Sequence, residues 1–222
     1  MLSRQLAWAA LVMLLHSSAA WAADSGMISF TLDFPNSAPE HYSIKLQPDG
    51  QAEYESTGRI SQDSEERDQY RMDFRFSDAT RARIFQLAAQ AHYFSGKIDS
   101  GNKKLAFTGM KKLAYSDGQR NTSAEYNYSP VPPVQQLTTI FQTVSATLEY
   151  GRRLSYFHRY QKLALDAELK LMEDQARRGE LAELQSVKPI LQQIYDDSSV
   201  MKVVRARALR IMGMNPSSSA GS

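Results

Sequence analysis

The chain offers few side chains for catalysis, and their spacing matches no catalytic or metal-binding motif. It has no cysteine, which excludes a thiolate metal ligand and a cysteine nucleophile. His41, His92 and His158 are far apart in the sequence, and no H-E-x-x-H, no H-x-H and no histidine pair at i, i+4 occurs. We therefore expect no metal and no cofactor, and we assign no catalytic residue.

Hydrolytic chemistry without a metal has equally weak support. The G-x-S-x-G motif of serine hydrolases is absent. The S-x-x-K spacing over residues 100–103 falls in a stretch with loop composition, whereas that chemistry needs the start of a helix. A hydrolase with a dispersed acid–base site stays open as an alternative. It would require at least two members of one set to meet in a pocket: Asp33, Asp73, Asp99, His92 and His158.

The least ordinary segment is residues 150–162, YGRRLSYFHRYQK, which holds four aromatic and four cationic side chains. Tyrosine and arginine are enriched at binding hot spots, and arginine packs favourably over aromatic rings. The candidate binding residues are Arg152, Arg153, Tyr156, His158, Arg159 and Tyr160, joined by Tyr126 and Tyr128 if the last strand lies nearby. Alternatively, the arginines extend into solvent while one helix face docks on the sheet, formed by Tyr150, Leu154, Phe157 and Gln161.

The elements that must position these residues change character at Pro130. Before it, apolar residues fall on every second position, the period of half-buried strands. Ser77 and Asp78 begin one helix within this half, and short strands are predicted over 105–107 and 113–115 after it. The pattern predicts an α+β domain over residues 24–130, with a mostly antiparallel sheet of about six strands and one packed helix.

After the prolines the apolar period becomes helical. Residues 134–178 fit one long helix, or two nearly collinear ones with a break at Gly151 and a poorly buried middle. Further helical patterns follow, with short connections that indicate antiparallel neighbours. We predict an antiparallel helical region over residues 131–213 and a disordered tail over 214–222.

The first 23 residues have the features of a bacterial secretory signal peptide: Arg4, a short apolar run and the cleavage signal Ala20-Trp21-Ala22. No other run is long enough for a transmembrane helix. The formal net charge of +2 gives no electrostatic argument for nucleic acid. We therefore expect a periplasmic or extracellular protein after cleavage.

Three short features over residues 40–128 carry a resemblance. They are a hairpin with Asp49-Gly50 and Tyr54, a helix with Arg83, Phe85 and Leu87 ending at Tyr93-Phe94, and a strand pair around Asp117-Gly118. Together they resemble an uncharacterised domain of secreted bacterial proteins. The resemblance implies an exported α+β domain, and it implies no activity.

The sequence thus favours an exported, non-catalytic protein of the bacterial envelope or periplasm. We expect it to bind another macromolecule, either a protein or a component of the cell envelope. Besides the dispersed hydrolase, a second alternative is a small-ligand or peptide binder that uses the open face of the sheet. That alternative predicts aromatic side chains exposed on one sheet face.

Overall fold

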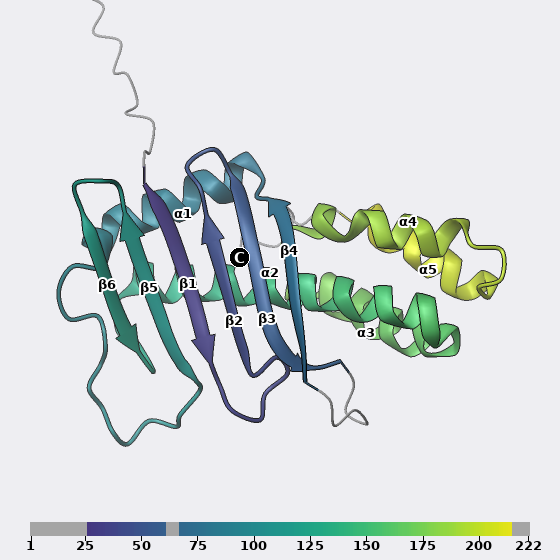
Figure 1. Cartoon of the computed structure of the whole chain (residues 1–222), viewed down its shortest axis with the longest axis horizontal. Coiled ribbons are helices and arrows are strands. Elements are labelled where there is room, and N and C mark those ends of the chain that lie inside the picture. Colours follow the sequence, from purple (N-terminus) through teal and green to yellow (C-terminus); the bar gives the residue numbers. More distant parts are fainter. Residues whose placement is uncertain (1–25, 61–66, 215–222) are drawn as a thin grey trace, which may run out of the picture.

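The computed structural model describes residues 26–60 and 67–214. It contains a six-stranded antiparallel sheet with strand order β4-β3-β2-β1-β5-β6, followed by a helical region (Figure 1). The predicted α+β fold with a helical C-terminal region is confirmed. The predicted signal peptide, 1–23, lies outside the described residues, as does the predicted tail except for Met214.

The strands follow the two-residue period of the sequence. Most of their inward positions are apolar and buried, as in Phe30 and Ile44, and most of their outward positions are polar. Gly50, with φ of 91°, allows the tight connection between the second and third strands. The six strands are β1 (Met27–Asp33), β2 (His41–Leu46), β3 (Gln51–Arg59), β4 (Arg67–Arg75), β5 (Met110–Ser116) and β6 (Asn121–Tyr126).

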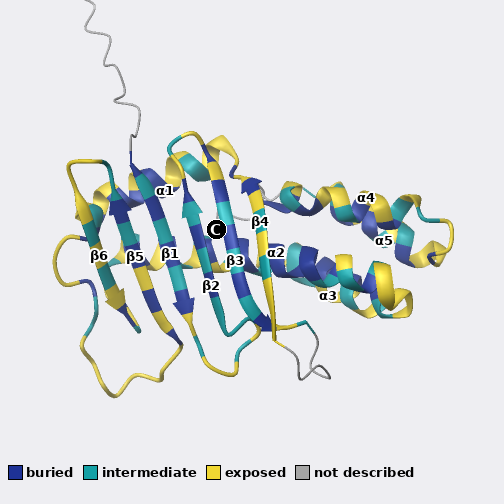
Figure 2. Ribbon diagram, viewed as in Figure 1, coloured by how far each residue is buried: buried dark blue, intermediate teal, exposed yellow. Residues whose placement is uncertain are grey.

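Two helices cover the inner face of this sheet (Figure 2). The Ser77 hydroxyl caps α1 (Asp78–Gln90) by accepting from the amide of Thr80, and the short η1 (His92–Phe94) follows. The first half of α2 (Pro132–Tyr160) lies beside α1, and its Phe141 ring stacks on Phe30 with centroids 5.1 Å apart. The inner sheet face, α1 and this half of α2 share one apolar core.

The second half of α2 extends past the sheet and belongs to a second core (Figure 1). This core begins near Tyr150, so the prolines mark the start of α2 while the two cores meet farther along it. Among the described helices, none is both long and apolar enough to cross a membrane. The other elements of this core are η2 (Lys162–Ala164), α3 (Leu165–Arg177), η3 (Leu184–Val187), α4 (Lys188–Asp196) and α5 (Lys202–Met212).

The predicted break at Gly151 is wrong. The helix α2 runs unbroken through this residue to Tyr160, and the next residue, Gln161, has a φ of −144° that is not helical. A Cβ on Gly151 would lie 2.6 Å from Cγ1 of Val187, so the glycine lets η3 approach α2 closely. The expected poorly buried middle is wrong for Tyr150 and Leu154, which η3 and its neighbours cover. It is right farther along, because Ser155 and residues 159–162 are exposed.

Candidate functional site

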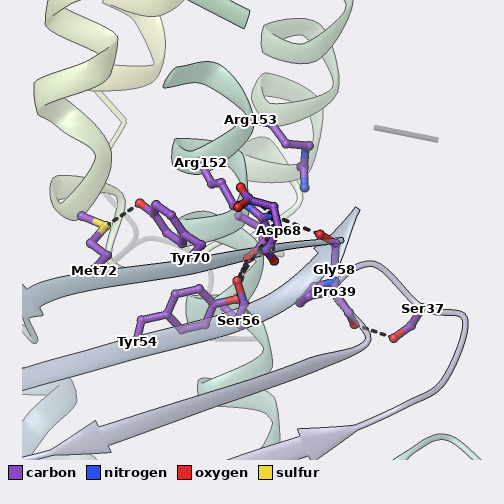
Figure 3. A network of polar contacts seen from close by, with 12 residues as sticks. Ser37, Pro39, Tyr54, Ser56, Gly58, Asp68, Tyr70, Met72, Arg152 and Arg153 are labelled. Carbon is purple, nitrogen blue, oxygen red and sulfur yellow. Dashed lines mark hydrogen bonds and ion pairs between the residues drawn. The ribbon is translucent and has the colours of Figure 1, made fainter. Parts of the chain in front are cut away.

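Arg152 points from α2 toward the sheet and is buried, with 2% of its side chain exposed (Figure 3). Its Nη2 donates to the carbonyl of Gly58 at 3.1 Å and lies 3.4 Å from the carboxylate of Asp68. Its Nη1 lies 3.4 Å from the carboxylate of Glu149 one turn earlier. Its guanidinium also lies 5.7 Å from the ring centroid of Tyr70. The expectation that both arginines extend into solvent is therefore wrong for Arg152.

Glu149 completes a buried polar network between α2 and β3. One of its carboxylate oxygens accepts from the hydroxyls of Tyr54 at 2.9 Å and Ser56 at 2.6 Å. Burial, and then the negative charge of Glu149, raise the pKa of Tyr54 well above its usual range, so the phenol keeps the proton that it donates. These contacts fix α2 against the end of the sheet and leave Arg152 unavailable to a partner.

Arg153, the next residue, points toward α3 and the β1–β2 connection. Its Nε donates to Glu168 of α3 at 2.6 Å, and its guanidinium lies over the Tyr150 ring, 4.6 Å from the centroid. The side chain is about one quarter exposed, at 24%. It borders a cavity of about 310 Å³ between α2 and the β1–β2 connection, lined by Leu32, Phe34, Ser37, Ala38, Pro39, Tyr42, Gln142, Ser145, Ala146, Glu149, Tyr150, Arg153 and Gln175.

The last turn of α2 carries the exposed part of the candidate segment. The rings of Tyr156 and Tyr160 lie 5.1 Å apart, and the Arg159 guanidinium lies 5.2 Å from the Tyr160 ring centroid. Tyr160 is 62% exposed, and Leu163 in the following η2 is 83% exposed. We call Tyr156, Arg159, Tyr160 and Leu163 the tip surface, because they lie where α2 turns into α3.

His158 and Lys162 hold the base of the tip. The Nε2 atom of His158 lies 2.9 Å from a carboxylate oxygen of Asp197, and the Lys162 ammonium donates to the same oxygen at 2.6 Å. The Lys162 contact, followed by those of Ser199, lowers the pKa of Asp197 far below its usual range. His158 therefore joins α2 to the α4–α5 connection, and only its partial exposure would allow contact with a partner.

Tyr126 and Tyr128 do not join the other candidates. Tyr126 is buried, with its hydroxyl 2.6 Å from that of Thr138 near the start of α2. The Tyr128 hydroxyl accepts from Gln135 in the same region. At 1.5 Å per residue, Thr138 and Tyr160 are about 33 Å apart along the helix axis. The structure thus divides the eight candidates among a buried network, a cavity wall, the tip and the start of α2.

The residues proposed for a dispersed hydrolase site also lie apart. Asp33 pairs with His41 at 2.6 Å, and Asp99 accepts from the amides of Gly101 and Asn127. Asp73 faces outward from β4 opposite Glu53. His92 and His158 lie in other parts of the fold. Within residues 26–60 and 67–214, no group of three His, Asp or Glu side chains could hold a metal ion.

The open sheet face lacks the aromatics that the ligand-binding alternative predicts. The outward positions of the six strands carry polar, charged or small residues, together with Met27 and Met110. Ion pairs such as Lys45–Glu53 cross this face. The face is a solvated charged surface with no aromatic platform on its strands.

Comparison of the chain with protein-family models and with curated proteins finds no match. The resemblance over residues 40–128 stays a prediction.

Proposed function

We propose that the chain is an exported, non-catalytic protein of the bacterial envelope or periplasm that binds another protein through its tip surface. One observation carries the proposal: Tyr160 is mostly exposed beside Arg159, and the mostly exposed Leu163 follows three residues later in η2. Single exposed apolar side chains are ordinary in soluble proteins. A clustered pair of tyrosines with an arginine and a leucine has the composition of an interface hot spot.

The tip is also ordered before any partner arrives. Tyr156 packs against both Phe157 and Tyr160, and Arg159 lies over the Tyr160 ring. The contacts of His158 and Lys162 with Asp197 fix the backbone beneath these side chains. Side chains that are already restrained lose less conformational entropy on binding, which favours affinity.

Of the segment singled out in the sequence, only its C-terminal part serves this function. Arg152 is committed to the buried network, and Arg153 faces the cavity. Tyr126 and Tyr128 are too distant to touch a partner bound at the tip. Export is supported by the signal-peptide features of residues 1–23.

The test is site-specific photo-cross-linking in cells that naturally produce the protein. A photoreactive phenylalanine replaces Tyr160 in one variant and Tyr128, which is 46% exposed at the opposite end of α2, in the control. We expect a discrete adduct with one partner from position 160 and none from position 128. Adding R159A should remove the adduct and leave the melting temperature within about 2 °C of the wild type, as for an ordinary surface substitution.

Equal labelling from both positions, or no adduct from position 160, would refute the tip as the binding surface. A large loss of stability on R159A would instead show that the tip is part of the helical core.

A further inference from the structure

The cavity beside Arg153 is separate from the tip surface. Leu32, Phe34 and Tyr42 line it from the sheet, and the loop of residues 37–39 lines it from the β1–β2 connection. Successive turns of α2 complete it from Gln142 to Arg153. A volume of about 310 Å³ lies at the lower end of the range typical of small-ligand sites.

Arg153 brings hydrogen-bond donors that nothing in the described chain uses. Its Nε is held by Glu168, and its guanidinium rests on the Tyr150 ring. Its two Nη atoms have no hydrogen-bond partner among residues 26–60 and 67–214. A guanidinium presents parallel donors that match the two oxygens of a carboxylate, and here its orientation is already fixed.

The acidic residue on the same wall is not equivalent to Arg153. Glu149 also lines the cavity, but its oxygens accept from Tyr54, Ser56 and Arg152. The negative charge of Glu149 is thus balanced by Arg152 on the sheet side of α2. The cavity therefore has free donors for an anionic group, whereas its acidic group is already occupied.

The remainder of the lining is mixed, because Ser37, Gln142 and Gln175 present polar side chains beside an apolar part. Leu32, Phe34, Ala38, Pro39 and Ala146 contribute side chains without hydrogen-bonding groups. The apolar surface continues outward, because the half-exposed Phe107 packs edge-on against Phe34 with ring centroids 5.8 Å apart. At about 30 Å³ for one water molecule, the volume corresponds to roughly ten water-sized groups.

From this lining we infer that the cavity binds a small carboxylate with an apolar chain of about eight carbons. The carboxylate pairs with the Nη atoms of Arg153, and the chain lies along Leu32 and Pro39 toward Phe34. This ligand site is independent of the protein partner proposed for the tip.

Isothermal titration calorimetry with four eight-carbon probes tests the inference: octanoate, 1-octanol, octylamine and 2-aminooctanoate. We expect octanoate to bind with a Kd near or below about 1 mM, within reach of a ligand of this size. The alcohol and the amine should bind at least about ten-fold more weakly, because neither can accept the paired donors of Arg153.

Two variants assign the binding to this cavity. R153Q should weaken octanoate binding at least about ten-fold, whereas the matched control R159Q at the tip should leave it unchanged. A146L keeps Arg153 and fills the cavity, so it should also abolish binding, which guards against a folding defect in R153Q.

Three results would overturn the inference. They are octanoate binding that R153Q and A146L leave intact, octylamine binding as tight as octanoate, and 2-aminooctanoate binding ten-fold tighter than octanoate. The last result would place an ammonium group at Glu149 and make the ligand a zwitterion. None of these results bears on cross-linking at Tyr160, so the two proposals fail separately.

Discussion

Two stretches of α2 with similar composition have opposite surroundings. Arg152 is buried under the end of the sheet, while Arg159, two turns later, lies in solvent over the Tyr160 ring. Both arginines have aromatic neighbours, so composition does not distinguish them. They differ because the sheet ends beside α2 between the two positions. Arg152 therefore has a structural role, whereas Arg159 is free to bind a partner.

The burial of Arg152 depends on groups that only the sheet supplies. Its partners Gly58 and Asp68 face each other across β3 and β4, near the end of that strand pair. A buried guanidinium is tolerated only when such carbonyls and carboxylates satisfy it. Helix α2 has passed the edge of the sheet before Arg159 (Figure 1), so no described strand supplies this residue with comparable partners, and it is exposed.

The largest expected effect comes from removing the buried cation. R152M keeps much of the side-chain volume but leaves Glu149 buried without its counter-charge. We expect the free energy of unfolding to fall by about 3–5 kcal/mol, the usual cost of breaking a buried ion pair. Urea unfolding measures the change, and R159M at the tip is the control, expected within about 0.5 kcal/mol of the wild type.

A double variant tells whether the pairing itself is responsible. E149Q/R152M removes both charges, so it should be more stable than R152M alone. If the free energy of unfolding of the double variant fell by the sum of the losses in E149Q and R152M, Arg152 would stabilise the fold through packing and not through its charge pair with Glu149.

The next effect concerns the close approach of η3 to α2 beside the same arginine. G151A places a methyl group against the branched side chain of Val187, and we expect a loss of about 1–3 kcal/mol from overpacking. Adding V187A should restore part of the loss, although V187A alone creates a small cavity. Thermal unfolding of the wild type, G151A, V187A and the double variant completes the cycle. If the double variant lost the sum of the two single losses of stability, a direct clash between the two side chains would be contradicted.

Most of the fold could be predicted from local patterns. The alternation of Ile28, Phe30 and Leu32 predicts a one-sided strand, and Ser77 predicts the start of α1 correctly. Pro189 lies in the first turn of α4, where a proline removes no intrahelical hydrogen bond. These signals succeed because the backbone restriction of a residue such as proline, and the spacing of apolar residues, are both set within a few residues of the chain.

The errors arose where distant contacts outweigh a local signal. Residues 105–107 look like a strand but form a loop, in which the side-chain amide of Asn127 donates to the carbonyl of Ala106. Helix α2 continues through Gly151 because packing against Val187 outweighs the modest cost of a helical glycine.

The candidate site was predicted less well than the fold. Glu149 was missed because its partner Ser56 lies 93 residues away and no short motif joins them. A useful signal did exist: Ser56 falls at an inward strand position, and Ser145 and Glu149 fall on the same helix face as Phe141. Three polar residues at predicted core positions indicate buried hydrogen bonds, though not which residues pair.

The smallest expected effect lies at the tip and depends on pH. The contact with Lys162, aided by Ser199 and His158, holds the pKa of Asp197 below its ordinary value near 4. A carboxyl with a lowered folded-state pKa stabilises the fold above its ordinary pKa, and this stabilisation is lost as the pH falls below that value. D197N lacks the ionisable group, so it should be slightly less stable than the wild type at pH 6.

Unfolding of wild type and D197N, compared from pH 6 to pH 3, measures the effect. The difference between the two proteins should narrow as the pH falls, with faster amide exchange confined to residues around Asp197. R152M should show no faster amide exchange around Asp197 between pH 6 and pH 3, because position 152 lies outside the tip. If the difference in free energy of unfolding between wild type and D197N stayed constant with pH, the tip would be held by packing alone. The contrast between the buried Glu149–Arg152 pair and a tip held by solvent-accessible charges would then fail.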